Sequence, residues 1–422
     1  MKKFETLQVR AGHTPDTDTK SFFPPLYMTA GYVYDSAQDA QEVFELKKPG
    51  NIYSRLGNPT TAILEERLNA LEGGVGALAF SSGHAAFAGT IFTIMEAGQH
   101  IVAGRTLYGG TINMLTYSMP RLGINTTFVN TDDPENFRAA IRPETRLLYI
   151  EVIGNPQGNL SDIDAVAAIA REAGIPLLVD ATLATPYLYR PFEHGADLVL
   201  HSTTKYICGH GTTMGGVLID GGTFNWKNGK YPCLSESDPS YHGVVYADQF
   251  GKAAFIARAR AGTMRDFGSC PSPFNSFLLL QGIDTLSIRM ERHSENALKL
   301  ARHLKDHPAI GSVNHPALAD SPYKKLADRD WKRGCGGLFS IVLKGGKEAG
   351  AKLIDSLKLF SNVTHFADAR SMVCHPATTT HSQLTASQME ESGISPGLVR
   401  VSAGLEHIDD IIADFDQALA KN

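Results

Sequence analysis

Short apolar runs alternate with helix-length segments along the first half of the chain. The runs predict strands at 76–80, 100–104, 124–129, 146–152, 175–180, 196–201 and 215–219, with helical patterns at 84–97, 133–141 and 162–173. Nearly continuous apolar strands joined by crossover-length segments are typical of a parallel sheet covered on both faces. The sequence therefore predicts an α/β fold whose large, mostly parallel sheet binds its ligand beyond the carboxyl ends of the strands.

The segments on either side of this alternation have a different pattern. Residues 1–58 show little periodicity and contain several Pro and Gly, which predicts an extended arm. A helix then begins, because Asn58 can cap it, Pro59 suits its first turn and Gly73 can end it. Later patterns predict a long helix at 272–307, strands at 337–343 and 398–402, and helices at 247–260, 347–358 and 407–420. We expect an arm at 1–58, a large domain at 59–270 with an irregular segment from about 220, and a smaller C-terminal α/β domain at 271–422.

Composition excludes several classes of protein. The 422 residues are 43% hydrophobic and 20% charged, which is globular rather than disordered. The net charge of −5 gives no general field that favours nucleic acid or an anionic membrane, and no apolar run is a signal peptide or a membrane span. Five scattered cysteines without a C-x-x-C pair argue against a disulfide framework and a structural zinc site. We therefore expect a cytoplasmic protein without a nucleic-acid or membrane partner and without a metal, since the spacing of His375 and His381 suits no helical pair of ligands.

Polar residues at two predicted strand ends carry candidate chemistry. Lys205 follows the strand at 196–201, and is either a lysine that reaches solvent or a desolvated amine of lowered pKa, suited to form a Schiff base. Asp180 ends the strand at 175–180, and is either a cap or turn aspartate or a carboxylate that pairs with a protonated heterocycle nitrogen. A reactive lysine together with such an aspartate is what pyridoxal phosphate (PLP) requires.

Two further strand ends could complete a PLP site. SSGHAA (81–86) joins a strand to a helix, so the backbone N–H groups of Gly83 and His84 could bind an anion, while the His84 side chain is expected to pack. The hydroxyls of Ser202 and Thr204 could add donors. Tyr108 in LYGGT could stack on a cofactor ring and assist proton transfer, or could be an ordinary half-buried aromatic residue. Four such features at successive strand ends make a stronger case than any one of them.

Seven motifs, in order along nearly the whole chain, resemble those of the cystathionine γ-synthase/γ-lyase family. They are YSRLGNPT (53–60), SSGHAA (81–86), LYGGT (107–111), VDAT (179–182), HSTTKY (201–206), HPATTTH (375–381) and LVRVSAGLE (398–406). The resemblance implies a PLP-dependent enzyme of Cys and Met metabolism with the aspartate-aminotransferase-like fold, fold type I. The segment 220–275 is similar to the insertion of the O-acetylhomoserine sulfhydrylase branch of that family.

The resemblance also implies a role for each cofactor-binding residue. Lys205 would bind PLP covalently and, once freed, move substrate protons, assisted by Tyr108, which would stack on the ring. Asp180 would pair with the pyridine nitrogen, and Asn155 would hydrogen-bond the phenolic oxygen. The phosphate would be held by Gly83, His84, Ser202 and Thr204, and by Tyr53 and Arg55 of a neighbouring subunit.

The substrate side of the site rests on fewer residues. Arg400 lies in the middle of the apolar strand 398–402, which is costly unless an ion pair or a ligand carboxylate meets it. The resemblance implies that Arg400 clamps the substrate carboxylate and that Tyr53 also reaches the substrate. His365 takes the place of a Ser or Asn near that carboxylate, and could alter side-chain preference or the choice of sulfur donor. The stretch 151–156 departs from the family's Glu-Ser/Thr-x-x-Asn-Pro pattern but keeps Asn155.

The resemblance implies a PLP-dependent transferase of methionine biosynthesis. The expected reaction is γ-replacement on O-acetyl-L-homoserine, or another O-acylhomoserine, by sulfide or a small thiol, giving L-homocysteine or a thioether. A methionine or cystathionine γ-lyase, a cystathionine γ-synthase and a noncatalytic PLP-binding protein remain open. The insertion and Gly110, where methionine γ-lyases often carry Cys, favour the sulfhydrylase. The resemblance further implies a homo-oligomer, typically a tetramer of two active dimers, and leaves open whether a carrier protein delivers the sulfur.

Overall fold

The structure is a computed structural model that describes the whole chain except residues 1, 46, 380–381, 383–388, 390–392 and 422. His381, which was weighed as a metal ligand and set aside for its spacing from His375, lies outside the described residues. Among the helices that the structure describes, none is both long and apolar enough to cross a bilayer.

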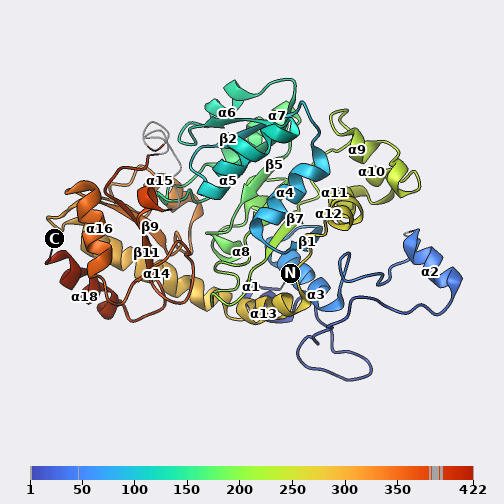
Figure 1. The fold of residues 1–422 in the computed structure, drawn as a ribbon, viewed down its shortest axis with the longest axis horizontal. Coiled ribbons are helices and arrows are strands. Elements are labelled where there is room, and N and C mark those ends of the chain that lie inside the picture. Colours follow the sequence, from blue (N-terminus) through green and yellow to red (C-terminus); the bar gives the residue numbers. More distant parts are fainter. Residues whose placement is uncertain (1, 46, 380–381, 383–388, 390–392, 422) are drawn as a thin grey trace.

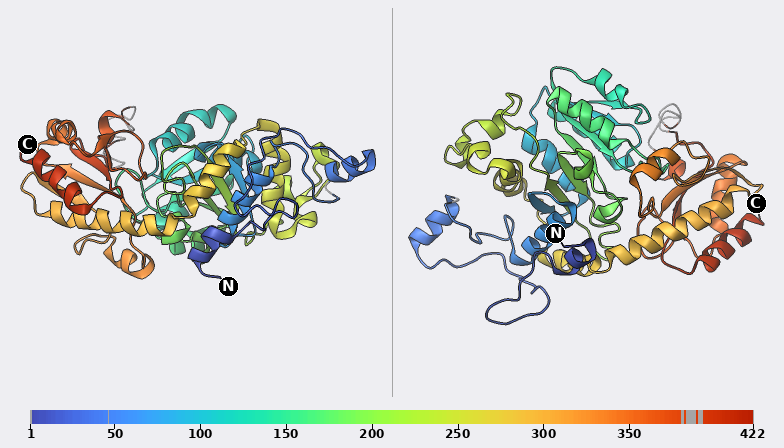
Figure 2. Two further views of the ribbon diagram at one scale, coloured as in Figure 1. Left: turned by 90° about the horizontal axis from the view of Figure 1, so that it is seen from below. Right: turned by 180° about the vertical axis from the view of Figure 1, so that it is seen from behind.

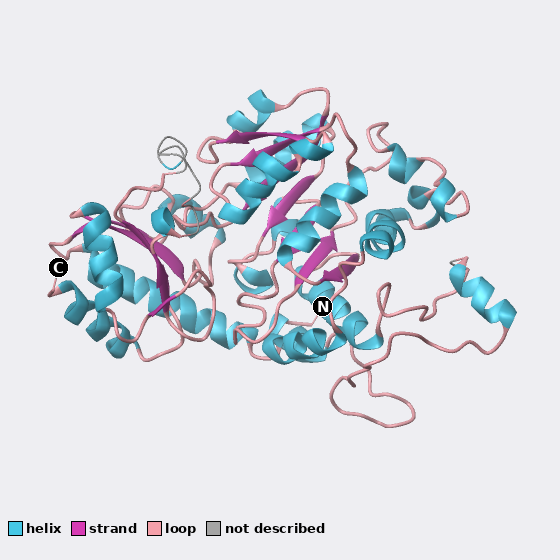
Figure 3. Cartoon of the chain, in the orientation of Figure 1, coloured by secondary structure: helices cyan, strands magenta, loops and turns pink. Residues whose placement is uncertain are grey.

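A seven-stranded sheet forms the centre of the molecule (Figures 1 and 3). Its order is β1-β7-β6-β5-β4-β2-β3, and only β7 runs antiparallel to its neighbours. The strands are β1 (Gly76–Phe80), β2 (His100–Gly104), β3 (Asn125–Val129), β4 (Thr145–Glu151), β5 (Leu177–Asp180), β6 (Leu198–His201) and β7 (Gly216–Asp220). The predicted α/β fold with a large, mostly parallel sheet is confirmed.

Helices cover both faces of this sheet, because alternate strand residues feed two separate hydrophobic cores. Ala77 and Ala79 of β1 face the core that α3, α7, α13 and α14 complete, whereas Leu78 and Phe80 face the core of α4 and of the segment after β7. The α-helices between residues 4 and 267 are α1 (Phe4–Arg10), α2 (Ala37–Phe44), α3 (Pro59–Glu72), α4 (Gly83–Ile94), α5 (Gly109–Asn113), α6 (Glu135–Ala140), α7 (Ile163–Ala173), α8 (Thr185–Leu188), α9 (Pro232–Ser235), α10 (Tyr246–Gln249), α11 (Ala254–Arg258) and α12 (Arg265–Phe267).

A second, five-stranded sheet lies towards the C-terminus, in the order β10-β11-β12-β9-β8. It packs against α14, α16 and α18 around a third core, and Figure 2 shows α14 running from the large sheet to the small one. The elements are α13 (Pro273–Ile283), α14 (Leu286–Lys305), β8 (Ile310–Asn314), α15 (Lys324–Asp330), β9 (Leu338–Leu343), α16 (Gly346–Ser356), β10 (Ser361–Asn362), β11 (Met372–Cys374), β12 (Leu398–Ser402) and α18 (Ile408–Leu419).

Three local expectations need correction. The pattern at 272–307 is two helices rather than one, because the chain turns at Asp284 and Thr285 between α13 and α14. The pattern at 247–260 is divided among short helical pieces. Residues 1–58 are not extended throughout, since α1 packs on α3 and Phe4 joins the large core. The proposed domain boundaries at 58 and 270 stay a prediction.

The rest of the N-terminal segment does lie away from both sheets (Figures 1 and 2). It carries exposed apolar side chains, with Phe22 78%, Met28 66% and Val33 98% exposed. Exposed apolar residues of this size in one segment are typical of a surface that contacts another chain.

Candidate active site

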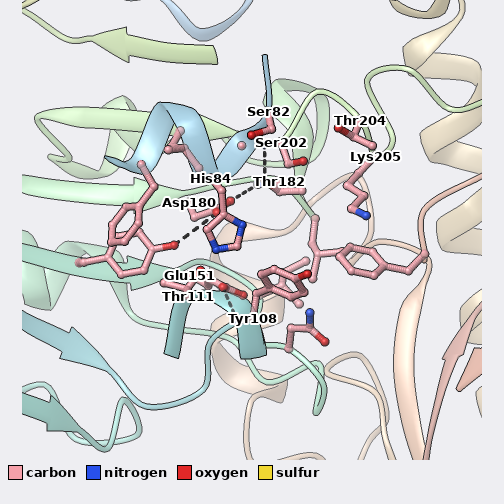
Figure 4. A pocket seen from close by; sticks show the side chains of 18 of the residues that line it. Ser82, His84, Tyr108, Thr111, Glu151, Asp180, Thr182, Ser202, Thr204 and Lys205 are labelled. Atoms are coloured by element: carbon pink, nitrogen blue, oxygen red, sulfur yellow. Dashed lines mark hydrogen bonds between the residues drawn. The ribbon is translucent and has the colours of Figure 1, made fainter. Parts of the chain in front are cut away.

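A cavity of about 180 Å³ opens at the carboxyl ends of β4, β5 and β6 and the N-terminus of α4 (Figure 4). It is lined by Ser82, Gly83, His84, Phe87, Tyr108, Thr111, Tyr149, Glu151, Ile153, Asn155, Asp180, Thr182, Leu183, Leu200, Ser202, Thr204, Lys205, Met214 and Phe366. Eight of the predicted site residues, Lys205, Asp180, Gly83, His84, Tyr108, Asn155, Ser202 and Thr204, are therefore brought together in one place.

Lys205 reaches this cavity from the tight turn that follows β6, where its N–H donates to the Ser202 carbonyl. Burial, together with the charge of Arg400, lowers the pKa of Lys205 to about 8. Its Nζ lies 2.9 Å from Nδ1 of His365 and 4.4 Å from the centre of the Phe366 ring. Burial and the Lys205 charge lower the pKa of His365 to about 4, so the imidazole is neutral and accepts a hydrogen bond from the ammonium.

Asp180 is a buried carboxyl at the end of β5 on the cavity wall. It accepts hydrogen bonds from the Thr182 N–H at 2.9 Å and from the Tyr149 hydroxyl at 3.4 Å. Burial raises its pKa, while the contacts with Thr182 and the nearby His201 oppose that rise. A cation placed against this carboxyl would recover part of the free energy lost by burial, and a protonated ring nitrogen is such a cation.

The N-terminus of α4 forms one side of the cavity. The Ser82 side chain caps the helix by accepting from the Ala85 N–H, and the N–H groups of Gly83 and His84 belong to the first turn, which has no intrahelical acceptor for them. A Cβ at position 83 would lie 2.7 Å from Cβ of Ser202, so only glycine allows this close approach. The Thr204 hydroxyl lines the cavity but already exchanges hydrogen bonds with the backbone of Gly215.

Tyr108 lies across the cavity, in the loop between β2 and α5. Its N–H donates to Oε1 of Glu151 at 2.7 Å, and its ring centre is 5.4 Å from that of His84. A Cβ on Gly110 would lie 2.6 Å from Cε1 of Tyr108 and 2.7 Å from Cε1 of His84. The space for the tyrosine ring therefore depends on glycine at position 110.

Arg400 is 2% exposed and reaches the same region from β12. Its guanidinium donates to Oδ1 of Asn155 at 3.2 Å and to the carbonyls of Thr364 and His365 at 2.9 and 3.2 Å. Its Cζ is 4.7 Å from the Phe366 ring centre, so Arg400 and Lys205 both contact this ring. These neutral acceptors leave a buried positive charge that suits an incoming carboxylate.

Four of the predicted site residues are absent from the cavity lining. Arg400 and His365 still contact residues that line it, Asn155 and Lys205 respectively, whereas Tyr53 and Arg55 lie apart from it. Both lie on the N-terminal segment, where the Arg55 guanidinium stacks over the Tyr53 ring and Tyr53 is 44% exposed. Their expected role in a neighbouring subunit's site stays a prediction.

Sequence reasoning missed several residues of the site, notably Tyr149, Glu151, Thr182 and Phe366. Glu151 could have been found, because it is the last polar residue of the predicted strand 146–152, and Asp180 was found from the end of its strand in the same way. In the structure, the two residues are register partners. Phe366 gave no such signal, since it lies in a loop of the small-sheet region, 161 positions from Lys205.

The described residues fit PLP. The glycine-lined N-terminus of α4 can receive a phosphate, a buried carboxyl can hold a pyridinium, and Lys205 has an amine of lowered pKa at the same cavity. Tyr108 offers an aromatic face beside these groups (Figure 4).

Known proteins are similar to this chain over nearly its whole length. The chain is 49% identical to an O-acetyl-L-homoserine sulfhydrylase of Leptospira meyeri, over 99% of this chain and 96% of that protein. It is 46% identical to a homocysteine synthase of Schizosaccharomyces pombe, over 99% of this chain and 98% of the relative.

Solved structures agree in fold. A Campylobacter jejuni protein assigned as an O-acetylhomoserine (thiol)-lyase matches with a TM-score of 0.96 and 35% identity, over 99% of both chains. That crystal structure contains N'-pyridoxyl-lysine-5'-monophosphate at position 205 of its own chain. The metB protein of Corynebacterium glutamicum matches with a TM-score of 0.85 and 33% identity, over 100% of this chain and 98% of that one.

The family model described as Cys/Met metabolism PLP-dependent enzyme matches residues 5–420. Since this match spans almost the whole chain, the protein belongs to the family of PLP-dependent enzymes of Cys and Met metabolism, and its cofactor is PLP.

Proposed function

We propose that the enzyme catalyses γ-replacement on O-acetyl-L-homoserine, in which sulfide or a small thiol displaces acetate to give L-homocysteine or a thioether. The observation that carries this proposal is the similarity, over 98–99% of this chain's length, to relatives named O-acetyl-L-homoserine sulfhydrylase, homocysteine synthase and homocysteine/cysteine synthase. The proposed role is a step of methionine biosynthesis.

PLP, when bound, supplies an electron-accepting ring that stabilises negative charge developing on a bound amino acid. Asp180 would hold the proton on the ring nitrogen, and Gly83, His84, Ser202 and Thr204 would hold the phosphate. Asn155 would donate to the phenolic oxygen, and Tyr108 would cover one face of the ring.

Lys205 is proposed as the covalent anchor and as the base that moves protons at the substrate's α and β carbons. Its pKa of about 8 suits this work, because an amine that titrates near neutral pH can both accept and return a proton. The neutral His365 accepts a hydrogen bond from Nζ, and this contact would hold the amine in place between transfers.

Arg400 is proposed to bind the substrate carboxylate. Its three acceptors, Asn155 and the carbonyls of Thr364 and His365, fix the guanidinium without neutralising it. Because His365 also contacts Lys205, the same loop would orient both the group that binds the substrate and the group that moves its protons.

We further propose that the active form is a homo-oligomer, a tetramer of two dimers, in which Tyr53 and Arg55 complete a neighbouring copy's site. The exposed apolar residues of the N-terminal segment support this assignment, as does the absence of both side chains from their own chain's cavity lining. The five free cysteines are consistent with work in the reducing cytoplasm.

A product assay tests the proposed reaction. The PLP-loaded protein is given O-acetyl-L-homoserine with and without sulfide, and homocysteine, acetate, 2-oxobutyrate and ammonia are measured. Homocysteine that forms only with sulfide supports the proposal. Release of 2-oxobutyrate and ammonia without use of sulfide would identify a γ-lyase, and cystathionine formed with cysteine as nucleophile would identify a cystathionine γ-synthase.

A further inference from the structure

Glu151 is a buried acid of the cavity to which neither the sequence motifs nor the proposed mechanism gives a role. It ends β4, the strand next to β5, and Glu151 and Asp180 are register partners in the parallel pair β4–β5. Paired residues on neighbouring parallel strands point to the same face, and both line the cavity. Two carboxyl groups thus face the same small volume (Figure 4).

The hydrogen bonds of the two acids differ. Asp180 accepts two, from the Thr182 N–H and the Tyr149 hydroxyl. Glu151 accepts one, from the backbone N–H of Tyr108 at 2.7 Å. The acid with more donors is the better carboxylate, so the geometry favours the charge on Asp180 and the proton on Glu151.

The surroundings of Glu151 also favour its protonated, uncharged form. The residue is 6% exposed, and burial together with the negative charge of Asp180 raises the pKa of Glu151 well above its ordinary value. Lys205, the cation on the cavity wall, lies across the cavity from Glu151 (Figure 4) and already donates to His365.

A neutral carboxylic acid can still accept the Tyr108 N–H through its carbonyl oxygen. This contact joins the end of β4 to the β2–α5 loop and fixes the backbone from which the Tyr108 ring projects. Tyr108 is 39% exposed, and within the part of the chain that the structure describes the ring contact seen for it is with His84. The backbone contact therefore carries much of the positioning.

We propose that Glu151 is a positioning residue that works as an uncharged acid: it holds Tyr108 over the cofactor site and leaves Asp180 as the single carboxylate facing the ring nitrogen. This inference rests on the proposed placement of PLP in the cavity and is independent of which substrate reacts there.

The test compares E151Q with E151A. Glutamine keeps the carbonyl acceptor and the neutral charge, so E151Q should bind PLP within about threefold of the wild type, with an unchanged visible circular dichroism band. E151A removes the acceptor, so it should bind PLP about tenfold more weakly or worse, with an altered band that reports the displaced ring. Far-UV circular dichroism of both apoproteins checks that they fold.

A second comparison separates positioning from a general loss of structure. If Glu151 acts through Tyr108, adding E151A to a Y108A protein should weaken PLP binding by less than about twofold, because the group that it positions is already gone. An E151Q protein as defective as E151A would show that the negative charge is needed and would overturn the proposal. An E151A protein with wild-type affinity and an unchanged band would overturn it as well. Since both readouts are cofactor binding, a failed product assay would leave this result intact.

Discussion

Two cations of the site, the half-buried Lys205 and the buried Arg400, share their neighbouring side chains. Lys205 and Arg400 lie 4.4 and 4.7 Å from the same Phe366 ring, and the adjacent His365 contacts Lys205 through its side chain and Arg400 through its carbonyl. The charge of Arg400 helps to lower the pKa of Lys205, so the substrate-binding group and the reactive amine are electrostatically linked.

This link predicts the pH dependence of covalent PLP binding. Only the neutral amine attacks the aldehyde, and the pKa of Lys205 is lowered to about 8, so the rate should rise as the pH increases through about 8 and then level off. In R400Q the midpoint should move to higher pH, because the charge that lowers the pKa is removed. Stopped-flow absorbance after mixing apoprotein with PLP measures the rate. A wild-type midpoint near 10, or no shift in R400Q, would contradict the account.

Gly110 gives a second test at the scale of single residues. A Cβ there meets the rings of Tyr108 and His84, so G110A should displace the tyrosine and weaken PLP binding about fivefold or more. The matched control is G262A, since a Cβ at this other helical glycine meets nothing within 4 Å. Equilibrium PLP titration provides the measurement. Equal affinity in G110A and G262A would show that Tyr108 does not depend on this space.

Much of the site could be predicted from sequence, because parallel strands deliver their carboxyl ends to one edge. That rule brought Asp180, Lys205 and the Gly83 turn together without any knowledge of the loops. The contacts of His365 and Phe366 could not be derived in this way, since they depend on how the small-sheet region packs against the large one. The hydrogen bond of the Thr204 hydroxyl to the Gly215 backbone could not be predicted either. The sequence does not distinguish a threonine that binds a ligand from one that hydrogen-bonds to the backbone.

At the scale of elements, strong local signals were predicted correctly. The predicted cap of α3 at Asn58, its proline in the first turn and its end at Gly73 are confirmed, and the helix runs from Pro59 to Glu72. β8 was missed because its sequence, IGSVN, has few apolar residues, and within this strand Ile310 alone is buried. The long helix at 272–307 was overextended because apolar periodicity continues through the turn at Asp284.

The cap of α3 predicts a stability difference. Asn58 is 2% exposed; its Oδ1 accepts from Thr60 N–H, and its Nδ2 donates to Tyr27, Tyr32 and Ser54 of the N-terminal segment. N58A should therefore cost about 2 kcal/mol or more, whereas S36A, at the exposed cap of α2, should cost about 1 kcal/mol or less. Urea unfolding of the two apoproteins, compared by midpoint, checks the difference. Equal midpoints would mean that Asn58 does not tie the segment to α3.

At the scale of the whole molecule, the N-terminal segment is the feature that a single chain does not explain. It leaves the body of the protein with apolar residues exposed, and it carries Tyr53 and Arg55 outside the cavity lining of its own chain. An exposed segment of this kind is accounted for when a second copy covers it.

Mixing two inactive variants tests this arrangement. K205A lacks the reactive amine, and Y53A/R55A lacks the proposed arm contacts, so each homo-oligomer should be inactive or nearly so. If the arm serves a neighbour's site, co-refolding equal amounts should restore about a quarter of wild-type activity, because half of the dimers are mixed and each has one intact site. No recovery in an oligomer that size-exclusion chromatography shows to be mixed would place the arm in its own chain's site.

The role of Lys205 as the covalent anchor of PLP is tested by locating the bound cofactor. The PLP-loaded protein is reduced with borohydride and digested, and the pyridoxyl-modified peptide is sequenced by mass spectrometry. We expect one modified residue, Lys205, and no modified peptide in K205A. This role of Lys205 would be contradicted if a different lysine were modified in the wild type. It would also be contradicted if protein free of PLP, not treated with borohydride, still formed homocysteine.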